Sequence, residues 1–172
     1  YFLKAEAALQ GWIAGGDAAA KSYYEQGIQM SMSQYGVEIG DYLSSTVVPQ
    51  GYTDRLNSKN NISFTSVPSV AWGDGTNKLQ KIITQKWIAN YPMGIEAWCD
   101  YRRTGYPELF TARDNLSSAG YIGDIDSKRM VRRLPYPTTE KSSNSANVEA
   151  AIATMLGGPD TGSTDLWWAK KN

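Results

Sequence analysis

The sequence contains no histidine and only one cysteine, Cys99. Without histidine, the chain cannot form a Ser-His-Asp or Cys-His catalytic site from its own residues. It also lacks the ligands of a typical zinc site. A single cysteine cannot form an internal disulfide, so cysteine usage does not indicate the redox compartment. These absences argue against the commonest nucleophilic and zinc-dependent enzymes.

The chain also has no excess of charge of either sign. Its 172 residues include 17 Lys and Arg and 17 Asp and Glu. Nucleic-acid binding through the phosphate backbone needs a clustered positive face, so we expect no nucleic-acid partner. Hydrophobic residues make up 41% and charged residues 20%. This composition predicts one globular domain rather than a disordered or membrane-embedded chain.

Several motifs of catalysis and cofactor binding are missing as well. The sequence contains neither the G-x-S-x-G of a nucleophile elbow nor a G-x-G-x-x-G or P-loop pattern for phosphates. The turn at 73–75 is of a kind too common to indicate a calcium site. We therefore expect no cofactor and no metal.

Aromatic residues are unevenly distributed: 11 Tyr and 6 Trp stand against 3 Phe. Tyr and Trp combine an apolar ring with a polar group, which suits ligand platforms and partly hydrated surfaces. Long packed helices use the same residues, so this bias leaves both interpretations open.

The N-terminal third predicts a pair of helices. Segment 1–13 has helical spacing from its first residue, with one apolar face. Gly15-Gly16 ends it, and 18–35 predicts a second helix with an i,i+4 pair between Lys21 and Glu25. Helices joined by a short glycine turn form the hairpin of tetratricopeptide-like repeats. Because no start signal precedes the first helix, we expect the chain to be the C-terminal portion of a longer protein. The apolar face comprises Phe2, Ala5, Leu9, Trp12 and Ile13.

Further helices are predicted at 37–46, 78–91, 94–104 and 145–156, separated by a loop at 47–77 and another at 111–130. In the second of these helices the lysines, including Lys81, lie opposite the apolar face. In the third, Ile95, Trp98 and Cys99 point inward. The prolines of 130–137 indicate an extended segment, and Trp167 and Trp168 are expected to pack back onto the chain. The predicted fold class is mostly α, with tetratricopeptide-like helical hairpins, long surface loops and little β.

The 47–77 loop is the best candidate for a ligand site. Sugar faces stack on exposed aromatic rings, while amide, carboxylate and guanidinium groups bond the hydroxyls, and the loop contains this mixture of side chains. The alternative is that Trp72 and Phe64 fold inward and anchor the loop. The predicted ligand-binding residues are Tyr52, Arg55, Asn57, Trp72, Asp74 and Asn77.

Two pairs of carboxylates could in principle serve glycoside hydrolysis. Glu96 and Asp100 are four residues apart on one predicted helix, and Glu6 and Glu25 lie on adjacent helices. Acid and base normally face each other from different elements, so we expect Glu96 and Asp100 to pair with the arginines that follow, Arg102 and Arg103. For Glu6 and Glu25 we also expect ion-paired or solvated roles.

Three segments resemble the SusD/RagB family of outer-membrane nutrient-binding lipoproteins. The first is 85–107, which ends in the run Trp-Cys-Asp-Tyr-Arg-Arg-Thr-Gly-Tyr-Pro. The second is 132–137, followed by Glu140 and Asn144. The third is Gly-Gly-Pro-Asp at 157–160, followed by Trp167 and Trp168. The opening segment 2–8 also resembles the tetratricopeptide-like helices of the family. Together these marks cover nearly the whole chain in the family's order.

The resemblance implies a SusD-like α-superhelix with ligand loops and no catalysis. It implies an oligosaccharide ligand and a SusC-like TonB-dependent transporter as partner. It also implies the extracellular face of the outer membrane, reached through a lipid anchor on an N-terminal part outside this chain. On this basis 1–172 is the C-terminal portion of one SusD-like domain, divided into helices at 1–46, a loop insertion at 47–77, and helices, loops and tail at 78–172. A scaffold that binds protein or peptide remains an alternative, and a glycoside hydrolase using Glu96 or Glu6 is a second.

Overall fold

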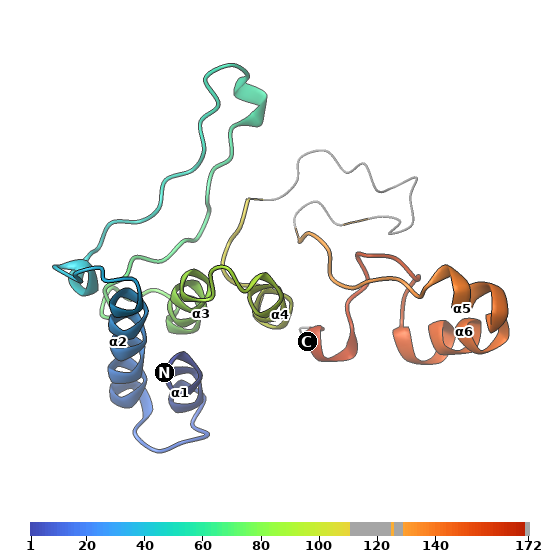
Figure 1. Ribbon diagram of the computed structural model, residues 1–172, viewed down its shortest axis with the longest axis horizontal. Helices are drawn as coiled ribbons and strands as arrows, with labels where there is room; N and C mark the ends of the chain where they lie inside the picture. The colour runs from blue at the N-terminus through green and yellow to red at the C-terminus, as the bar shows by residue number, and fades with distance from the viewer. Residues whose placement is uncertain (111–124, 126–128, 171–172) are drawn as a thin grey trace. The chain divides into compact units, whose positions relative to one another are not determined.

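The computed structural model describes residues 1–110, 125 and 129–170. These residues belong to two compact units, 1–109 and 110–172, which are described separately (Figure 1). Helices predominate, no strand is assigned in the described residues, and an isolated β-bridge joins Tyr52 and Ile62. The mostly α fold class is therefore confirmed. Among the described residues, no helix combines the length and apolar character needed to span a membrane.

The first unit begins with a helical hairpin, formed by α1 (Phe2–Leu9) and α2 (Gly16–Gln34). The alanines of their interface are almost fully buried. Because these side chains are small, the two helices can approach closely. At Gly27 the approach is closest: a Cβ there would lie 2.9 Å from ring carbons of Phe2. The predicted ion pair between Lys21 and Glu25 is present at 2.7 Å.

Two further helices follow, α3 (Lys78–Ala89) and α4 (Gly94–Thr104), and α3 contacts α1, α2 and α4. Asn77 caps α3, since its side-chain oxygen accepts a hydrogen bond from the Gln80 amide at 3.1 Å. Gly105 ends α4 in the left-handed conformation, with φ of 79°. Both helices therefore have the bounds that the sequence predicts to within two residues.

Some expectations for this unit are wrong. Helix α1 ends at Leu9 rather than at 13, and Trp12 is 73% exposed in the connection to α2. The helix expected at 37–46 is only a 3₁₀ turn, η1 (Tyr42–Ser44). On α4, Ile95 is 75% exposed, and the buried residues include Asp100 instead. Ion pairs rather than apolar contacts decide which face of α4 is covered.

Residues 46–68 form an extended arm that leaves the helices and returns to them (Figure 1). The short turn η2 (Ser58–Asn60) lies at its tip. Tyr52 and Ile62 exchange two backbone hydrogen bonds, of 2.8 and 2.9 Å, which hold the outgoing and returning halves together. The loop predicted at 47–77 is present, and this β-bridge and the turn η2 are the regular features assigned within it.

The second unit contains α5 (Thr138–Ser143), α6 (Ser145–Ala151), a π-helical turn η3 (Ile152–Leu156) and a 3₁₀ turn η4 (Trp167–Ala169). The segment 131–137 is extended, as predicted. Trp167 is 80% exposed, so the prediction that it packs back onto the chain is wrong. Most of the loop predicted at 111–130 lies outside the described residues.

Candidate functional site

Six residues were predicted to bind ligand, and the structure places them in three different environments. Trp72 lies in the core, only 6% exposed, with its ring tilted against that of Tyr24 at 5.1 Å between centroids. Its ring nitrogen donates to Asp17 at 3.4 Å. A sugar cannot stack on a ring face covered in this way, so Trp72 has the inward position of the alternative interpretation and is not retained as a platform.

Asp74 and Asn77 lie at the base of the arm, where hydrogen bonds within the unit engage both side chains. The Asp74 carboxylate accepts from Lys81 at 2.8 Å, from the Thr76 amide and hydroxyl at 3.0 and 2.7 Å, and from the Ser69 hydroxyl. Beyond capping α3, Asn77 donates from its amide to the Tyr106 hydroxyl at 3.0 Å. These bonds give both residues a structural role.

The electrostatics of Asp74 follow from these contacts. Burial alone raises the pKa of its carboxyl, but the hydrogen bonds from Lys81, Ser69 and Thr76 lower it more, so the pKa lies well below the ordinary value. Asp74 is therefore ionised throughout the neutral range and holds the buried ammonium group of Lys81. Lys81 also donates to the Ser69 carbonyl at 2.7 Å.

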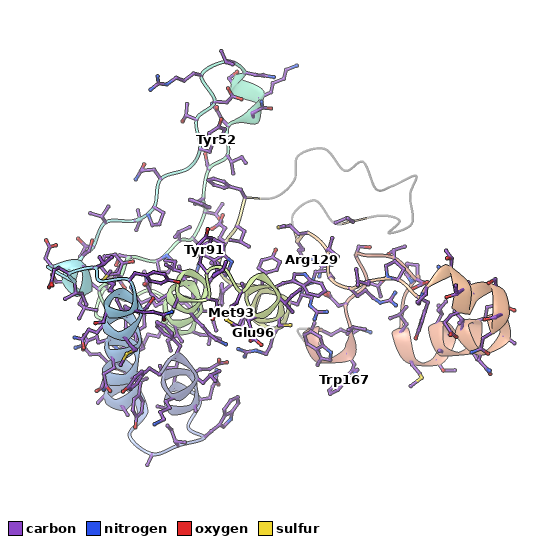
Figure 2. All side chains as sticks on the ribbon, viewed as in Figure 1. Tyr52, Tyr91, Met93, Glu96, Arg129 and Trp167 are labelled. Atoms are coloured by element: carbon purple, nitrogen blue, oxygen red, sulfur yellow. The ribbon has the colours of Figure 1, made fainter. Side chains whose placement is uncertain are left out.

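Tyr52, Arg55 and Asn57 remain exposed on the arm (Figure 2, where Tyr52 is labelled). Tyr52 is 48% exposed. The side chain of Asn57 accepts a hydrogen bond from the Lys59 amide at 3.1 Å, which leaves its amide NH₂ available. These three residues share one projecting segment and supply a ring, a cation and an amide.

Asp54 organises the tip between these residues. Its carboxylate accepts from Asn60 at 2.7 Å and from the amides of Leu56 and Asn57 at 2.8 and 3.2 Å. Hydrogen bonds from Asn60 and these two amides lower the pKa of Asp54. Because the carboxylate is committed to the turn, the tip is shaped before any ligand arrives.

Glu108 holds the base of the arm, and no pattern in the sequence pointed to it. One carboxylate oxygen accepts from the Thr65 amide at 2.8 Å and the Thr65 hydroxyl at 3.1 Å, and the other accepts from the Ser66 amide at 2.8 Å. Gln80 donates to the Ser66 carbonyl beside it. Because more than 40 residues separate Glu108 from these partners, local spacing could not reveal the contact.

The carboxylates considered for hydrolysis are mostly held in ion pairs. Buried Glu6 pairs bidentately with Arg103 across α1 and α4. Asp100 pairs with Lys86 at 2.7 Å and with Arg103 at 3.1 Å. Arg102 lies over the Trp98 ring at 3.7 Å. The ion-paired roles expected for Glu6, Glu25 and Asp100 are confirmed, while Glu96 lies exposed on α4 (Figure 2).

Comparison with known proteins assigns the family. The model of the SusD-like family, described as Susd and RagB outer membrane lipoprotein, matches residues 1–169. The chain belongs to the SusD-like family. No curated protein matches it. The family resemblance of the three signature segments is therefore confirmed over nearly the full chain.

Solved SusD-like structures support the same assignment. A chitin-binding SusD homologue from Flavobacterium johnsoniae is 44% identical, with a TM-score of 0.82, and the match covers 100% of this chain and 35% of that one. A SusD homologue from Bacteroides uniformis is 43% identical, with a TM-score of 0.81, covering 99% and 35%. A SusD-like protein from Bacteroides thetaiotaomicron is 42% identical, with a TM-score of 0.82, covering 99% and 36%. The chain thus spans about a third of the length of these SusD-like proteins.

Proposed function

We propose that this chain is part of a protein that captures oligosaccharides at the cell surface without cleaving them. The observation that carries the proposal is the 44% identity, over the entire chain, to a SusD homologue described as chitin-binding. The exposed ring, guanidinium and amide of the arm are groups able to contact a sugar's apolar face and hydroxyls. Binding of this kind needs no nucleophile and no shifted acid.

The proposed location is the extracellular face of the outer membrane, with a lipid anchor carried outside this chain. It is supported by the description of the family as outer membrane lipoproteins. The proposed partner is a SusC-like TonB-dependent transporter that receives the captured sugar. We further propose that 1–172 is the C-terminal portion of a single SusD-like domain, supported by the third of each relative that it covers.

The proposed ligand contacts of this chain are Tyr52, Arg55 and Asn57. Asp74 and Asn77 are left out because hydrogen bonds within the unit engage their side chains. Hydrolysis is not part of the proposal, because Glu6, one of the carboxylates considered for catalysis, is buried and paired with Arg103. Glu96 is exposed, and Asp100, the carboxylate considered together with it, is held in ion pairs with Lys86 and Arg103.

Affinity electrophoresis in gels containing soluble chitin fragments, or other polysaccharides in parallel, tests the ligand and the arm together. The wild-type protein should be retarded by at least one glycan, and Tyr52→Ala should weaken that binding about fivefold, since an aromatic contact contributes about 1 kcal/mol. Tyr1→Ala is a matched control, because Tyr1 is 49% exposed and lies outside the arm. Retardation by none of the glycans, with binding of peptides instead, would favour the protein-binding scaffold.

A further inference from the structure

Several hydrogen bonds connect the returning half of the arm, and the residues that follow it, to other parts of the first unit. Glu108 and Gln80 hold residues 65 and 66. Further along, the Tyr24 hydroxyl donates to the Val70 carbonyl at 2.9 Å. The Ala71 amide donates to the Ser45 carbonyl at 2.9 Å, which joins the two ends of the loop. These hydrogen bonds hold the returning side of the arm at its base.

Among these contacts, those made by Glu108 reach furthest along the arm towards its tip. It engages two consecutive amides and a hydroxyl with one carboxylate, and a charged acceptor makes such bonds stronger than neutral ones. Because the two carboxylate oxygens accept from two consecutive amides, they fix the direction of the segment at 65–66 as well as its position. Tyr52, Arg55 and Asn57 lie beyond this point, so any angular freedom at 65–66 moves all three.

We propose that Glu108 is a positioning residue that sets the pose of the arm and, through it, the affinity for the ligand. The second part of this inference rests on the proposed function. Holding the arm before binding means that the ligand does not have to order it, and preorganisation of this kind raises affinity by lowering the cost of binding. Glu108 itself does not need to touch the ligand.

Two substitutions grade the effect. Glu108→Gln keeps the shape and one acceptor oxygen but turns an NH₂ group towards an amide donor, so part of the attachment is lost. Glu108→Ala removes all three bonds. Glu96→Gln is the matched control, because it makes the same chemical change at an exposed site on α4. Thr65→Val removes only the hydrogen bond from the Thr65 hydroxyl to Glu108, so it should have a smaller effect than either Glu108 substitution.

The pose of the arm can be measured without a ligand. In the full chain carrying Cys99→Ser, spin labels at Gln29→Cys on α2 and Lys59→Cys at the tip report one distance distribution by pulsed electron resonance. Glu108→Gln should broaden this distribution and Glu108→Ala should broaden it more, while Glu96→Gln leaves it unchanged. The melting temperature identifies any variant that fails to fold, and Thr65→Val then supplies the test.

Titration calorimetry with chitin hexasaccharide gives the second readout. We expect Glu108→Gln to weaken binding about fivefold, as when one or two further side chains must be ordered on association. An unchanged distance distribution in both Glu108 variants would overturn the inference. A broadened distribution with unchanged affinity would overturn its second part. If the wild-type protein binds no glycan, the proposed function fails, and the spin-label widths alone decide whether Glu108 positions the arm.

Discussion

Lys81 shows how a single residue can contradict the pattern of its helix. Periodicity predicted it on the polar side of α3, yet the residue is 1% exposed, with its ammonium group bound to Asp74 and to the Ser69 carbonyl. A buried lysine is tolerated only where a carboxylate and further acceptors replace water. Its partners lie in the loop before the helix, and a helical projection of the sequence does not include them.

Removing the Lys81 ammonium group should destabilise the first unit. Lys81→Met keeps most of the volume but removes the ammonium donor to the Ser69 carbonyl and the charge partner of Asp74, which should cost about 2 kcal/mol of unfolding free energy. Lys21→Met, in an exposed i,i+4 pair, should cost at most about 0.5 kcal/mol. Urea unfolding of the two variants measures both values, and equal losses would contradict the account.

Asp74 should make stability depend on pH. Burial raises the pKa of its carboxyl, but hydrogen bonds from Lys81, Ser69 and Thr76 lower it by a larger amount. The pKa in the folded protein therefore lies below the 3.8 of an unperturbed carboxyl. The unfolded chain therefore takes up the proton first, so this contribution is complete at neutral pH and declines as the pH falls below about 4.

The melting temperatures of wild type and Asp74→Asn, followed from pH 7 to pH 3, test this. The wild-type protein should be more stable at pH 7, and the difference should shrink as the pH falls through the window below 4. A difference that stays constant across this range would show that Asp74 does not titrate as described.

At the scale of elements, helix ends were easier to predict than buried faces. Asn77 and Gly105 are local end signals, and the helices they bound have the predicted limits. Ile95 was expected inside and lies outside, because α4 turns Asp100 and Arg103 towards Lys86 and Glu6. Such long-range pairs, like the contact of Glu108 with the arm, depend on the folded arrangement and leave no spacing in the sequence.

The α1–α2 hairpin offers a test of close packing. Alanine normally stabilises a helix relative to glycine, by up to about 1 kcal/mol. At Gly27, however, the added Cβ would overlap the ring of Phe2 in the core, so Gly27→Ala should destabilise by about 1 kcal/mol net. Gly94→Ala meets no atom within 4 Å and should be neutral or stabilising. Thermal unfolding of both variants decides, and stabilisation by Gly27→Ala would contradict the described packing.

In the second unit, one carboxylate connects three parts of the chain. Asp160 pairs with buried Arg133, lies 2.7 Å from the Lys141 ammonium group, and accepts from the Tyr136 amide at 3.1 Å. The extended segment was predicted from its prolines, but nothing local showed that a carboxylate beyond 156 would hold it. This is the same limit that hid Glu108.

Asp160→Asn should loosen this segment. The substitution leaves the buried guanidinium of Arg133 without its charge partner, which should cost about 3 kcal/mol. Limited proteolysis should then cut within 131–137 faster than in the wild type, whereas Glu140→Gln, at an exposed site of α5, should not change the rate. Equal cleavage rates in the two variants would mean that Asp160 is not the main attachment.

At the scale of the whole molecule, several large apolar side chains are exposed at the connections between helices. Figure 2 shows Tyr91 and Met93 at the connection between α3 and α4, and both are exposed, as is Trp12 after α1. The chain spans about a third of the length of its solved relatives, and these exposed side chains are candidates for contact with other protein.

The ligand residues were the least predictable feature at this scale. The composition of the 47–77 loop suggested a ligand site, but it could not separate Trp72, which packs on Tyr24, from Tyr52, which is exposed on the arm. Both are aromatic residues among turn-forming neighbours. Only the folded positions distinguish the buried ring of Trp72, which anchors the loop, from the exposed ring of Tyr52.

Capture without cleavage is the central claim, and one measurement tests it most directly. The purified chain is titrated with chitin hexasaccharide in a calorimeter, and the sugar is then recovered and its chain length determined. The account predicts saturable binding and recovery of the hexasaccharide intact, with no new reducing ends. Shorter products would contradict it.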